Sequence, residues 1–368
     1  MTRQRLALIG PVLPFRGGIA QHTTMLHRAM PEVAEHLTVS FTRQYPAFIF
    51  PGECDRDPAY DGYEETGVDY LIDSLNPLTW RKAVRHILAF KAEIVVLPWW
   101  TVYWAFCFGY LARTLRRRGL TVVFFCHNVV EHESAGWKSL LTRWGLGQGS
   151  RFVVHTRQDE AKLKQLLPDA QVRVHAHPIY DQFPKSRGVC PKRGELELLF
   201  YGFVRPYKGL DLLIDAMAKT SDDIHLTIAG EFWDGEEQVR SRIQALGLEE
   251  RVILRPRYHT DKETAELFAC ADVVVLPYRN ATGSGVVPLA YHYDKPVIVT
   301  RVGGLPDVVQ EGETGWVVEP ENVEDLAQVI NAMTRAEAQA MVPAIQKLKG
   351  KMTWMSLVST MLDDPAKL

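Results

Sequence analysis

The sequence predicts an α/β protein made of two doubly wound domains, each with a parallel sheet covered by helices. Short apolar runs alternate with amphipathic segments along the whole chain, which is the pattern of strand–helix–strand units. About six apolar runs lie on each side of residue 180, too many for one sheet of ordinary size. The stretch 177–194 between them is rich in proline, glycine and charge, as linkers are.

The predicted elements follow one another regularly in the sequence. The runs predicted to be buried strands are Leu6–Ile9, Leu37–Phe41, Ile94–Leu97, Thr121–Cys126, Phe152–His155, Val172–His175, Leu198–Tyr201, His225–Ala229, Val252–Leu254, Val273–Leu276, Pro296–Thr300 and Gly315–Val318. The segments predicted to be helices include Gly18–Met30, Leu78–Phe90, Asp159–Leu167, Gly209–Ala218, Glu236–Leu246, Lys262–Cys270 and Val323–Met333.

Three competing interpretations fit less well. The charge-free segment Ile94–Ala112 is long enough to span a membrane, but Pro98 after a strand-like run favours a strand, a loop and a helix over Val102–Arg118. A single (β/α)₈ barrel would leave no place for a linker in the middle of the chain. The first apolar run is too short for a secretory signal peptide.

Composition excludes several classes of protein. The chain has 368 residues, with 42 Lys+Arg against 44 Asp+Glu, so no overall basic field indicates a nucleic-acid partner. Five scattered cysteines without a CxxC pair predict neither a disulfide framework nor a structural zinc site, and they favour a reducing, cytoplasmic compartment.

Two loops of the second half carry candidate anion-binding groups. Arg205 and Lys208 follow a predicted strand that ends at Gly202 and precede a helix, where two cations would suit a diphosphate. The stretch Thr282-Gly283-Ser284-Gly285-Val286 also lies between a strand and a helix, and its glycines would let backbone N–H groups approach an anion. The alternatives are two solvated loop cations and an ordinary glycine turn.

The first half carries a third glycine loop and a strand-end histidine. Gly17 and Gly18 open the first predicted helix, but neither GxGxxG nor a P-loop pattern is present. His127 and Asn128 follow a buried strand, the position where doubly wound proteins place functional groups. A metal site at His132 and Glu133 is disfavoured because their spacing matches no zinc-protease pattern. Asp55-Arg56-Asp57 matches a DxD metal motif in an acidic loop, which we interpret as a solvated turn.

Taken in order, these motifs resemble the retaining glycosyltransferases of family 4, also called glycosyltransferase group 1, over nearly the whole chain. The match is strongest from Leu198 to about Ile330. The residues that carry it are Gly202, Arg205, Lys208-Gly209, Ile228–Gly230, Ala271–Val273, Leu276-Pro277, Gly283–Val286, Pro296–Ile298, Gly303–Val309 and Gly315. The resemblance implies a GT-B fold, with two Rossmann-like domains facing a central cleft.

The resemblance also implies domains and roles. Residues 1–180 would bind the acceptor, 181–350 would bind a nucleotide-sugar donor, and 351–368 would form a helix returning to the first domain. Arg205 and Lys208 would neutralise the donor diphosphate, and His127 would contact the donor sugar. The other implied donor-binding residues are Gly17, Gly18, Gly202, Gly230, Arg257, Tyr258, Thr282, Gly283, Ser284, Gly285 and Val286. The expected enzyme transfers a hexose with retention and needs no metal or other cofactor.

One departure from the family pattern concerns two glutamates that commonly hold donor hydroxyls. Aligning Gly283 and Gly285 with that segment places Thr282 and Ala290 at the glutamate positions. A non-catalytic nucleotide-sugar-binding protein is therefore an alternative. A two-domain epimerase or dehydrogenase that acts on a nucleotide sugar or with NAD is a separate alternative, and the missing GxGxxG argues against NAD.

The acceptor is expected to be a saccharide or a lipid-linked sugar, as in bacterial surface polysaccharide or glycolipid assembly. Trp99 and Trp100 begin an aromatic cluster, and with Asn128 they are the candidate acceptor residues. The stretch Trp137–Leu146 combines basic and apolar residues, which suits a peripheral contact with the inner face of the cytoplasmic membrane. Packing of these aromatics in the core is the alternative.

Overall fold

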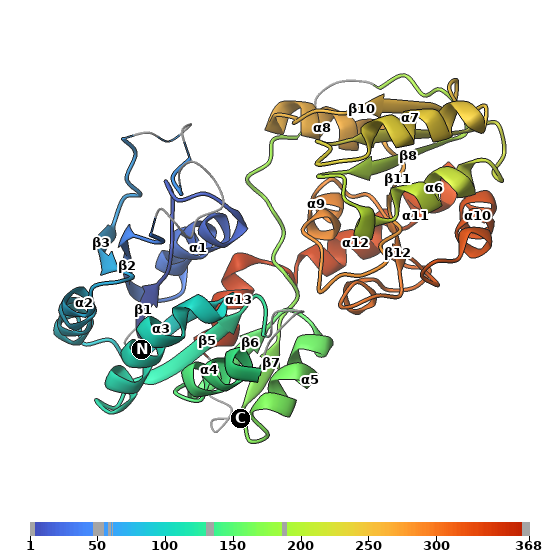
Figure 1. Ribbon diagram of the computed structural model, residues 1–368. Coiled ribbons are helices and arrows are strands. Elements are labelled where there is room, and N and C mark those ends of the chain that lie inside the picture. The colour runs from blue at the N-terminus through green and yellow to red at the C-terminus, as the bar shows by residue number, and fades with distance from the viewer. Residues whose placement is uncertain are drawn as a thin grey trace. The chain divides into compact units, whose positions relative to one another are not determined.

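A computed structural model describes residues 4–46, 55–57, 60, 62–129, 136–185 and 190–362. The chain divides into two compact units (Figure 1). The first unit comprises Met1–His175 together with Trp354–Leu368, and the second comprises Ala176–Thr353. The sequence placed the corresponding boundaries after residues 180 and 350. The class expected from the sequence, two Rossmann-like α/β domains, is confirmed.

The first unit contains a seven-stranded sheet in the order β3-β2-β1-β4-β5-β6-β7, and all its strand pairs are parallel. The strands are β1 (Arg5–Ile9), β2 (Glu35–Arg43), β3 (Val68–Asp73), β4 (Ile94–Trp99), β5 (Thr121–Cys126), β6 (Arg151–Val154) and β7 (Val172–Val174). The helices that precede the linker are α1 (Gly18–Ala29), α2 (Pro77–Ala89), α3 (Ala105–Arg116), α4 (Gly136–Leu146) and α5 (Arg157–Leu166).

The predicted strands and helices of this unit are present, and one strand was missed. β3 pairs with β2 at the edge of the sheet, and most of its side chains are only half-buried. Asp69 and Asp73 interrupt its apolar residues, so the sequence does not read as a buried run. The charge-free segment Ile94–Ala112 folds as β4, a short 3₁₀ turn and the start of α3. Among the described residues, no helix is both long and apolar enough to cross a membrane.

The last helix, α13 (Trp354–Leu362), packs in the first unit although the second unit precedes it in the chain. Its buried side chains Trp354, Leu357, Val358 and Met361 form one core cluster with residues of β1, β4, β5 and β6. α13 also packs against α1. This helix therefore completes the cover on one face of the first sheet.

The second unit contains a six-stranded parallel sheet in the order β10-β9-β8-β11-β12-β13. Its strands are β8 (Leu196–Tyr201), β9 (Ile224–Ala229), β10 (Val252–Arg255), β11 (Val273–Leu276), β12 (Val297–Thr300) and β13 (Gly315–Val318). Its helices are α6 (Leu210–Met217), α7 (Glu236–Ala245), α8 (Asp261–Cys270), α9 (Val286–His292), α10 (Val323–Ala332), α11 (Arg335–Ala340) and α12 (Val342–Lys349).

The expectation about cysteines is wrong for one pair. Cys190 and Cys270 form a disulfide with their Cα atoms 5.2 Å apart, whereas Cys107 and Cys126 are buried free thiols. The two half-cystines are 80 residues apart in sequence. They meet because the segment before β8 runs past the end of α8, where Lys192 Nζ also donates to the carbonyl of Cys270 at 2.9 Å. Sequence spacing alone could not show this proximity.

Trp354→Ala should destabilise the first unit by about 3–5 kcal/mol, because the buried indole leaves a cavity under α13. Chemical unfolding followed by circular dichroism measures this change. Met355→Ala is the matched control, since Met355 is on the same helix and is exposed, and it should change stability by under about 0.5 kcal/mol. Equal effects of the two substitutions would mean that α13 is not part of the core.

Candidate functional site

The loop after β8 is fixed by two glycines at the carboxyl end of the second sheet. Gly202 has a φ of 98°, and its N–H donates to the carbonyl of Ala229 at 2.9 Å, which continues the β8–β9 ladder. Arg205 then precedes a 3₁₀ turn over Pro206–Lys208, and Gly209 ends that turn with a φ of 64°. A Cβ atom on Gly209 would overlap the carbonyl oxygen of Pro277. The loop is therefore seated against the residue that follows β11.

Lys208 brings a buried ammonium to the end of β8. Its residue is 8% exposed, and Nζ lies 5.5 Å from the centroid of the Tyr278 ring. A Cβ atom built on Gly202 would lie 3.3 Å from Nζ, so the ammonium packs against the turn itself. Burial, and secondly the charge of Arg205, lowers the pKa of Lys208 to about 8. The side chain is still predominantly charged at pH 7.

Arg205 lies next to this ammonium and is half-buried. Its Cζ lies 3.7 Å from the centroid of the Trp233 ring, which is a cation–π contact. Within the described part of the chain, no carboxylate forms an ion pair with Arg205 or Lys208, whereas nearby Arg279 pairs with both Asp211 and Glu321. Buried cations are normally paired, so the buried Lys208 ammonium beside the half-buried Arg205 guanidinium makes this loop a candidate site for an anion.

The second predicted loop lies beside these cations. The Tyr278 hydroxyl hydrogen-bonds Ser284 Oγ at 3.3 Å, and that Oγ accepts from the N–H of Val286 at 3.2 Å. Val286 Cγ2 lies 3.8 Å from a Cβ built on Gly202. A Cβ on Gly283 would meet no atom within 4 Å. The structure therefore brings Gly202, Lys208 and the loop 282–286 together.

The two positions aligned with family glutamates have different surroundings. Ala290 is fully buried in the core on α9. Thr282 is half-buried, and its carbonyl accepts from the N–H of Gly304 at 3.0 Å. Neither position supplies a carboxylate to the site.

Gly230 lies at this site, but the neighbouring arginine is already paired. A Cβ on Gly230 would overlap the carbonyl oxygen of Gly202, so close approach of β8 and β9 requires glycine here. Arg257 forms an ion pair with Glu263 at 2.6 Å, which helps to lower the pKa of Glu263 to about 2. Tyr258 is 69% exposed. Arg257 therefore brings no unpaired charge to the site, and Tyr258 contributes an exposed ring.

In the first unit, His127 continues the ladder between β4 and β5. Its N–H donates to the carbonyl of Trp99 at 2.8 Å, and its side chain is half-buried while Asn128 is exposed.

Trp99 itself is 1% exposed and packs edge-on against Phe124, so its indole belongs to the core. Trp100 is half-buried, and its Nε1 donates to the hydroxyl of Tyr45 at 2.9 Å.

In the glycine loop before α1, Gly17 has a backbone conformation that favours glycine, whereas Gly18 does not. Gly17 has a φ of 101° and is the N-cap of α1, and Gly18 is its first residue. A Cβ atom on either glycine would meet nothing within 4 Å. Backbone conformation therefore requires glycine at 17 and leaves the space beside 18 open.

Sequence reasoning did not assign a role to two histidines that lie beside His127. His22 on α1 has its ring centroid 4.6 Å from that of His127, and the ring centroid of His155, after β6, lies 5.7 Å from it. Two sequence features could have identified these histidines. His22 lies four residues after Gly18, on the buried face of α1, and His155 follows directly after a buried apolar run.

Two minor sequence motifs fall elsewhere. His132 and Glu133 lie outside the described residues. The DxD segment pairs with the loop before α1: the N–H of Asp57 donates to the carbonyl of Pro14 at 2.8 Å, and Arg16 N–H donates to the carbonyl of Asp55 at 2.8 Å.

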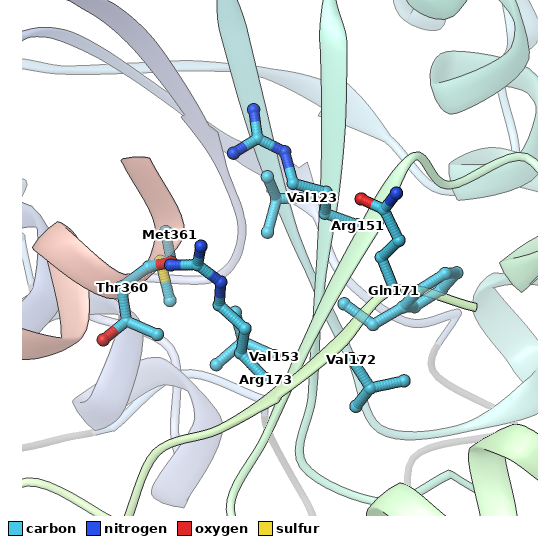
Figure 2. Close-up of a pocket in the computed structure, with 9 residues that line it drawn as sticks. Val123, Arg151, Val153, Gln171, Val172, Arg173, Thr360 and Met361 are labelled. Atoms are coloured by element: carbon cyan, nitrogen blue, oxygen red, sulfur yellow. The ribbon is translucent and has the colours of Figure 1, made fainter. Parts of the chain in front are cut away.

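The first unit contains a cavity of about 260 Å³ (Figure 2). It is bounded by the amino halves of β5, β6 and β7 and by Thr360 and Met361 of α13. Arg173 borders it and donates from Nη1 to the carbonyl of Thr360 at 3.3 Å. Since His127 and His155 follow the carboxyl ends of the same strands, this cavity is separate from the candidate site.

Comparison with known proteins identifies the second unit. Residues 183–347 match the family described as glycosyl transferases group 1. The second unit is a glycosyl transferases group 1 domain. The resemblance drawn from the sequence is confirmed for this domain.

Two curated relatives extend the comparison. The chain is 27% identical over 241 residues to GDP-mannose:glycolipid 4-beta-D-mannosyltransferase of Xanthomonas campestris pv. campestris, covering 65% of this chain and 66% of that protein. It is 32% identical over 157 residues to D-inositol 3-phosphate glycosyltransferase of Arthrobacter sp., covering 41% of this chain and 37% of that protein. The chain thus spans just under two thirds of the first relative and well under half of the second.

The group 1 domain and the first unit together match solved GT-B structures. The Anabaena protein Alr3699/HepE, solved in complex with UDP, superposes with a TM-score of 0.70 at 18% identity, covering 99% of this chain and 100% of that chain. The GT-B fold predicted from the sequence is confirmed.

Replacing Lys208 by Met should stabilise the group 1 domain at pH 7. The lowered pKa corresponds to roughly 3 kcal/mol of unfavourable burial of the charged form, and Met fills a similar volume without charge. Because the folded pKa lies below that of the unfolded chain, this penalty is present below about pH 8 and is relieved as the pH rises towards 10. Urea unfolding should therefore show a gain for Lys208→Met of about 1–3 kcal/mol at pH 7 that shrinks at pH 9.5. A loss of stability at pH 7 would show that Lys208 has a structural role.

Proposed function

We propose that this protein is a glycosyltransferase that moves a hexose from a nucleotide diphosphate sugar to an acceptor hydroxyl. The observation that carries the proposal is the pair of cations without carboxylate partners, Arg205 and Lys208, at the carboxyl end of β8 in a group 1 domain. A diphosphate is the anion whose size and charge suit one guanidinium and one ammonium side by side.

The two positive charges matter most while the bond between the sugar and the diphosphate breaks. As the bond between the anomeric carbon and the diphosphate oxygen breaks, its electron pair stays on the diphosphate, which becomes more negative. The acceptor oxygen then bonds to the anomeric carbon and passes its proton to an oxygen of the departing diphosphate. Arg205 can grip two phosphate oxygens, and Lys208 acts as a point charge against the same group. Each is expected to stabilise the transition state by about 2–4 kcal/mol.

The other predicted residues take supporting roles in this proposal. Gly17 and Gly18, from the first unit, and Ser284–Val286, from the second, would contact phosphate or sugar. His127 would contact the donor sugar, and Gly230 with the Arg257–Tyr258 surface would border the nucleoside. Trp100 and Asn128 remain candidate acceptor contacts, whereas Trp99 would support them from the core. No metal is required by this scheme.

The stereochemistry is proposed as retention, which rests on the family resemblance alone. The name of one relative, a 4-beta-D-mannosyltransferase, makes inversion the competing outcome. The absence of carboxylates at Thr282 and Ala290 means that donor hydroxyls are held by other groups, and it keeps a non-catalytic binder as the second candidate.

The proposal predicts which variants lose turnover. A thermal-shift panel of UDP-, GDP-, ADP- and dTDP-sugars should first find a donor, since a ligand at 100 times its Kd adds about 2.7 kcal/mol of stability. Arg205→Ala and Lys208→Ala should then each lower turnover of that donor by about 30- to 1,000-fold. Arg240→Ala, which removes an exposed ion pair with Glu236 on α7, is the control and should keep full activity.

Each result of this assay decides between candidates. Losses under about threefold for both variants would refute the role of the cations. A donor that stabilises the protein but is neither transferred nor hydrolysed would favour the binding protein. Proton NMR of the anomeric centre of the product distinguishes retention from inversion.

The acceptor is proposed to be a lipid-linked sugar at the cytoplasmic face of a membrane, as in polysaccharide or glycolipid assembly. The support is an apolar surface on α3 and α4, formed by Phe106, Trp137, Leu140 and Trp144. We call it the α4 surface. Phe106, Trp137 and Leu140 are 61%, 60% and 69% exposed. Three of these residues are spaced along one face of α4, and exposed arginines such as Arg143 and Arg113 lie on the same two helices. Apolar and basic groups together suit an anionic membrane interface.

Liposome flotation tests the α4 surface. The wild-type chain should float with vesicles containing anionic phosphatidylglycerol at low salt, and the double variant Trp137→Ser, Leu140→Ser should float about tenfold less because two large apolar groups no longer insert. Leu78→Ser is the matched control, since Leu78 is equally exposed on α2 of the same unit. Equal flotation of the two variants, or none by the wild type, would contradict the membrane contact.

A further inference from the structure

Three histidines from different elements converge in the first unit. His22 comes from α1, His127 follows β5 and His155 follows β6. One ring nitrogen of each lies within 4.8 Å of those of the other two. Among the residues that the structure describes, the group contains only histidines, so the donor atoms that these three offer are imidazole nitrogens.

Aromatic packing fixes the orientation of these rings. His22 is 2% exposed and stacks on Phe125 with centroids 4.8 Å apart and planes 17° apart. The Trp354 ring of α13 meets His22 edge-on, also at 4.8 Å. Phe125 further contacts His127 and His155 edge-on, at 4.6 and 4.9 Å. Rings held in this way lose little freedom when they bind a common ligand.

The hydrogen bond of His155 decides which of its nitrogens can ligate. Nδ1 lies 3.0 Å from the carbonyl oxygen of His175. Because a carbonyl can only accept, Nδ1 must carry the hydrogen, and the neutral ring then has its lone pair on Nε2. Metal-binding histidines typically donate the other ring N–H to a carbonyl or carboxylate in this way.

We propose that His22, His127 and His155 bind one divalent transition-metal ion, with Zn²⁺ as the representative. Imidazole ligands suit Zn²⁺, Co²⁺, Ni²⁺ or Cu²⁺, whereas Mg²⁺ and Ca²⁺ prefer oxygen. Tetrahedral Zn²⁺ with bonds of 2.0–2.1 Å needs nitrogens about 3.4 Å apart, so each ring moves inward by under roughly 1 Å. Three protein ligands leave a fourth position for water or a substrate oxygen.

This site goes beyond the proposed transferase activity and shares His127 with it, so an ion bound there would replace the proposed contact of His127 with the donor sugar. Its test measures metal binding without any sugar donor, so a failure of the transferase assay leaves the metal result intact. The reverse also holds, because the diphosphate site of Arg205 and Lys208 is assigned from the second unit alone.

The experiment titrates the untagged 368-residue chain, stripped of metal, with Co²⁺ and then Zn²⁺. We expect one Co²⁺ per chain with the intense visible bands of a four-coordinate ion, and displacement of these bands by Zn²⁺. His22→Phe keeps the stacked ring but has no ligand atom, and His155→Gln keeps a donor for the carbonyl of His175. Each variant should bind metal at least about tenfold more weakly.

His86→Ala is the matched control, because His86 is an exposed histidine of the same unit that pairs with Asp69. It should bind Co²⁺ like the wild type. The proposal is overturned if the wild type takes up no ion, if its Co²⁺ bands are the weak ones of a six-coordinate ion, or if His22→Phe and His155→Gln bind as tightly as the control. The wild-type spectrum decides the matter if both variants fail to fold, as judged by circular dichroism.

Discussion

The burial of the Lys208 ammonium is the constraint that organises the second unit's site. An ammonium enclosed by Tyr278 and the turn at Gly202 is unfavourable for folding, since no carboxylate of the described chain balances it. The loop nevertheless holds it there, because Gly209 seats the turn against Pro277 and the absence of a side chain at Gly202 leaves room for Nζ, which would lie only 3.3 Å from a Cβ atom. This unfavourable burial is consistent with the proposed function, in which the diphosphate would neutralise the ammonium.

The same edge of the sheet collects the remaining groups for a topological reason. In a parallel sheet all carboxyl ends lie on one side, so the loops after β8, β9 and β11 converge although they are distant in sequence. Gly230 meets Gly202 by this route, and Tyr278 links Lys208 to Ser284. The sequence could predict this convergence because each residue directly follows a recognisable strand.

What the sequence could not predict depends on contacts between distant segments or on weak patterns. β3 was missed because an edge strand is only half apolar, and α11 was missed because six residues are too few for a helical pattern to be recognised. The Cys190–Cys270 bond and the ion pair between Arg257 and Glu263 follow from how segments pack, which spacing does not reveal. The burial of Trp99 likewise depends on the packing of Phe124 and Gly145 against it.

The histidine group shows how the end of the chain shapes the first unit's site. His22 belongs to a helix that begins at Gly17, yet its ring is held between Phe125 of β5 and Trp354 of α13. His175, whose carbonyl fixes the tautomer of His155, is itself bound through Nε2 to Ser356 at 2.8 Å. Both connections lead to α13, which enters the first unit only after the whole second unit has been traversed. The geometry of these imidazoles therefore depends on the docking of α13 as much as on the strands that carry them.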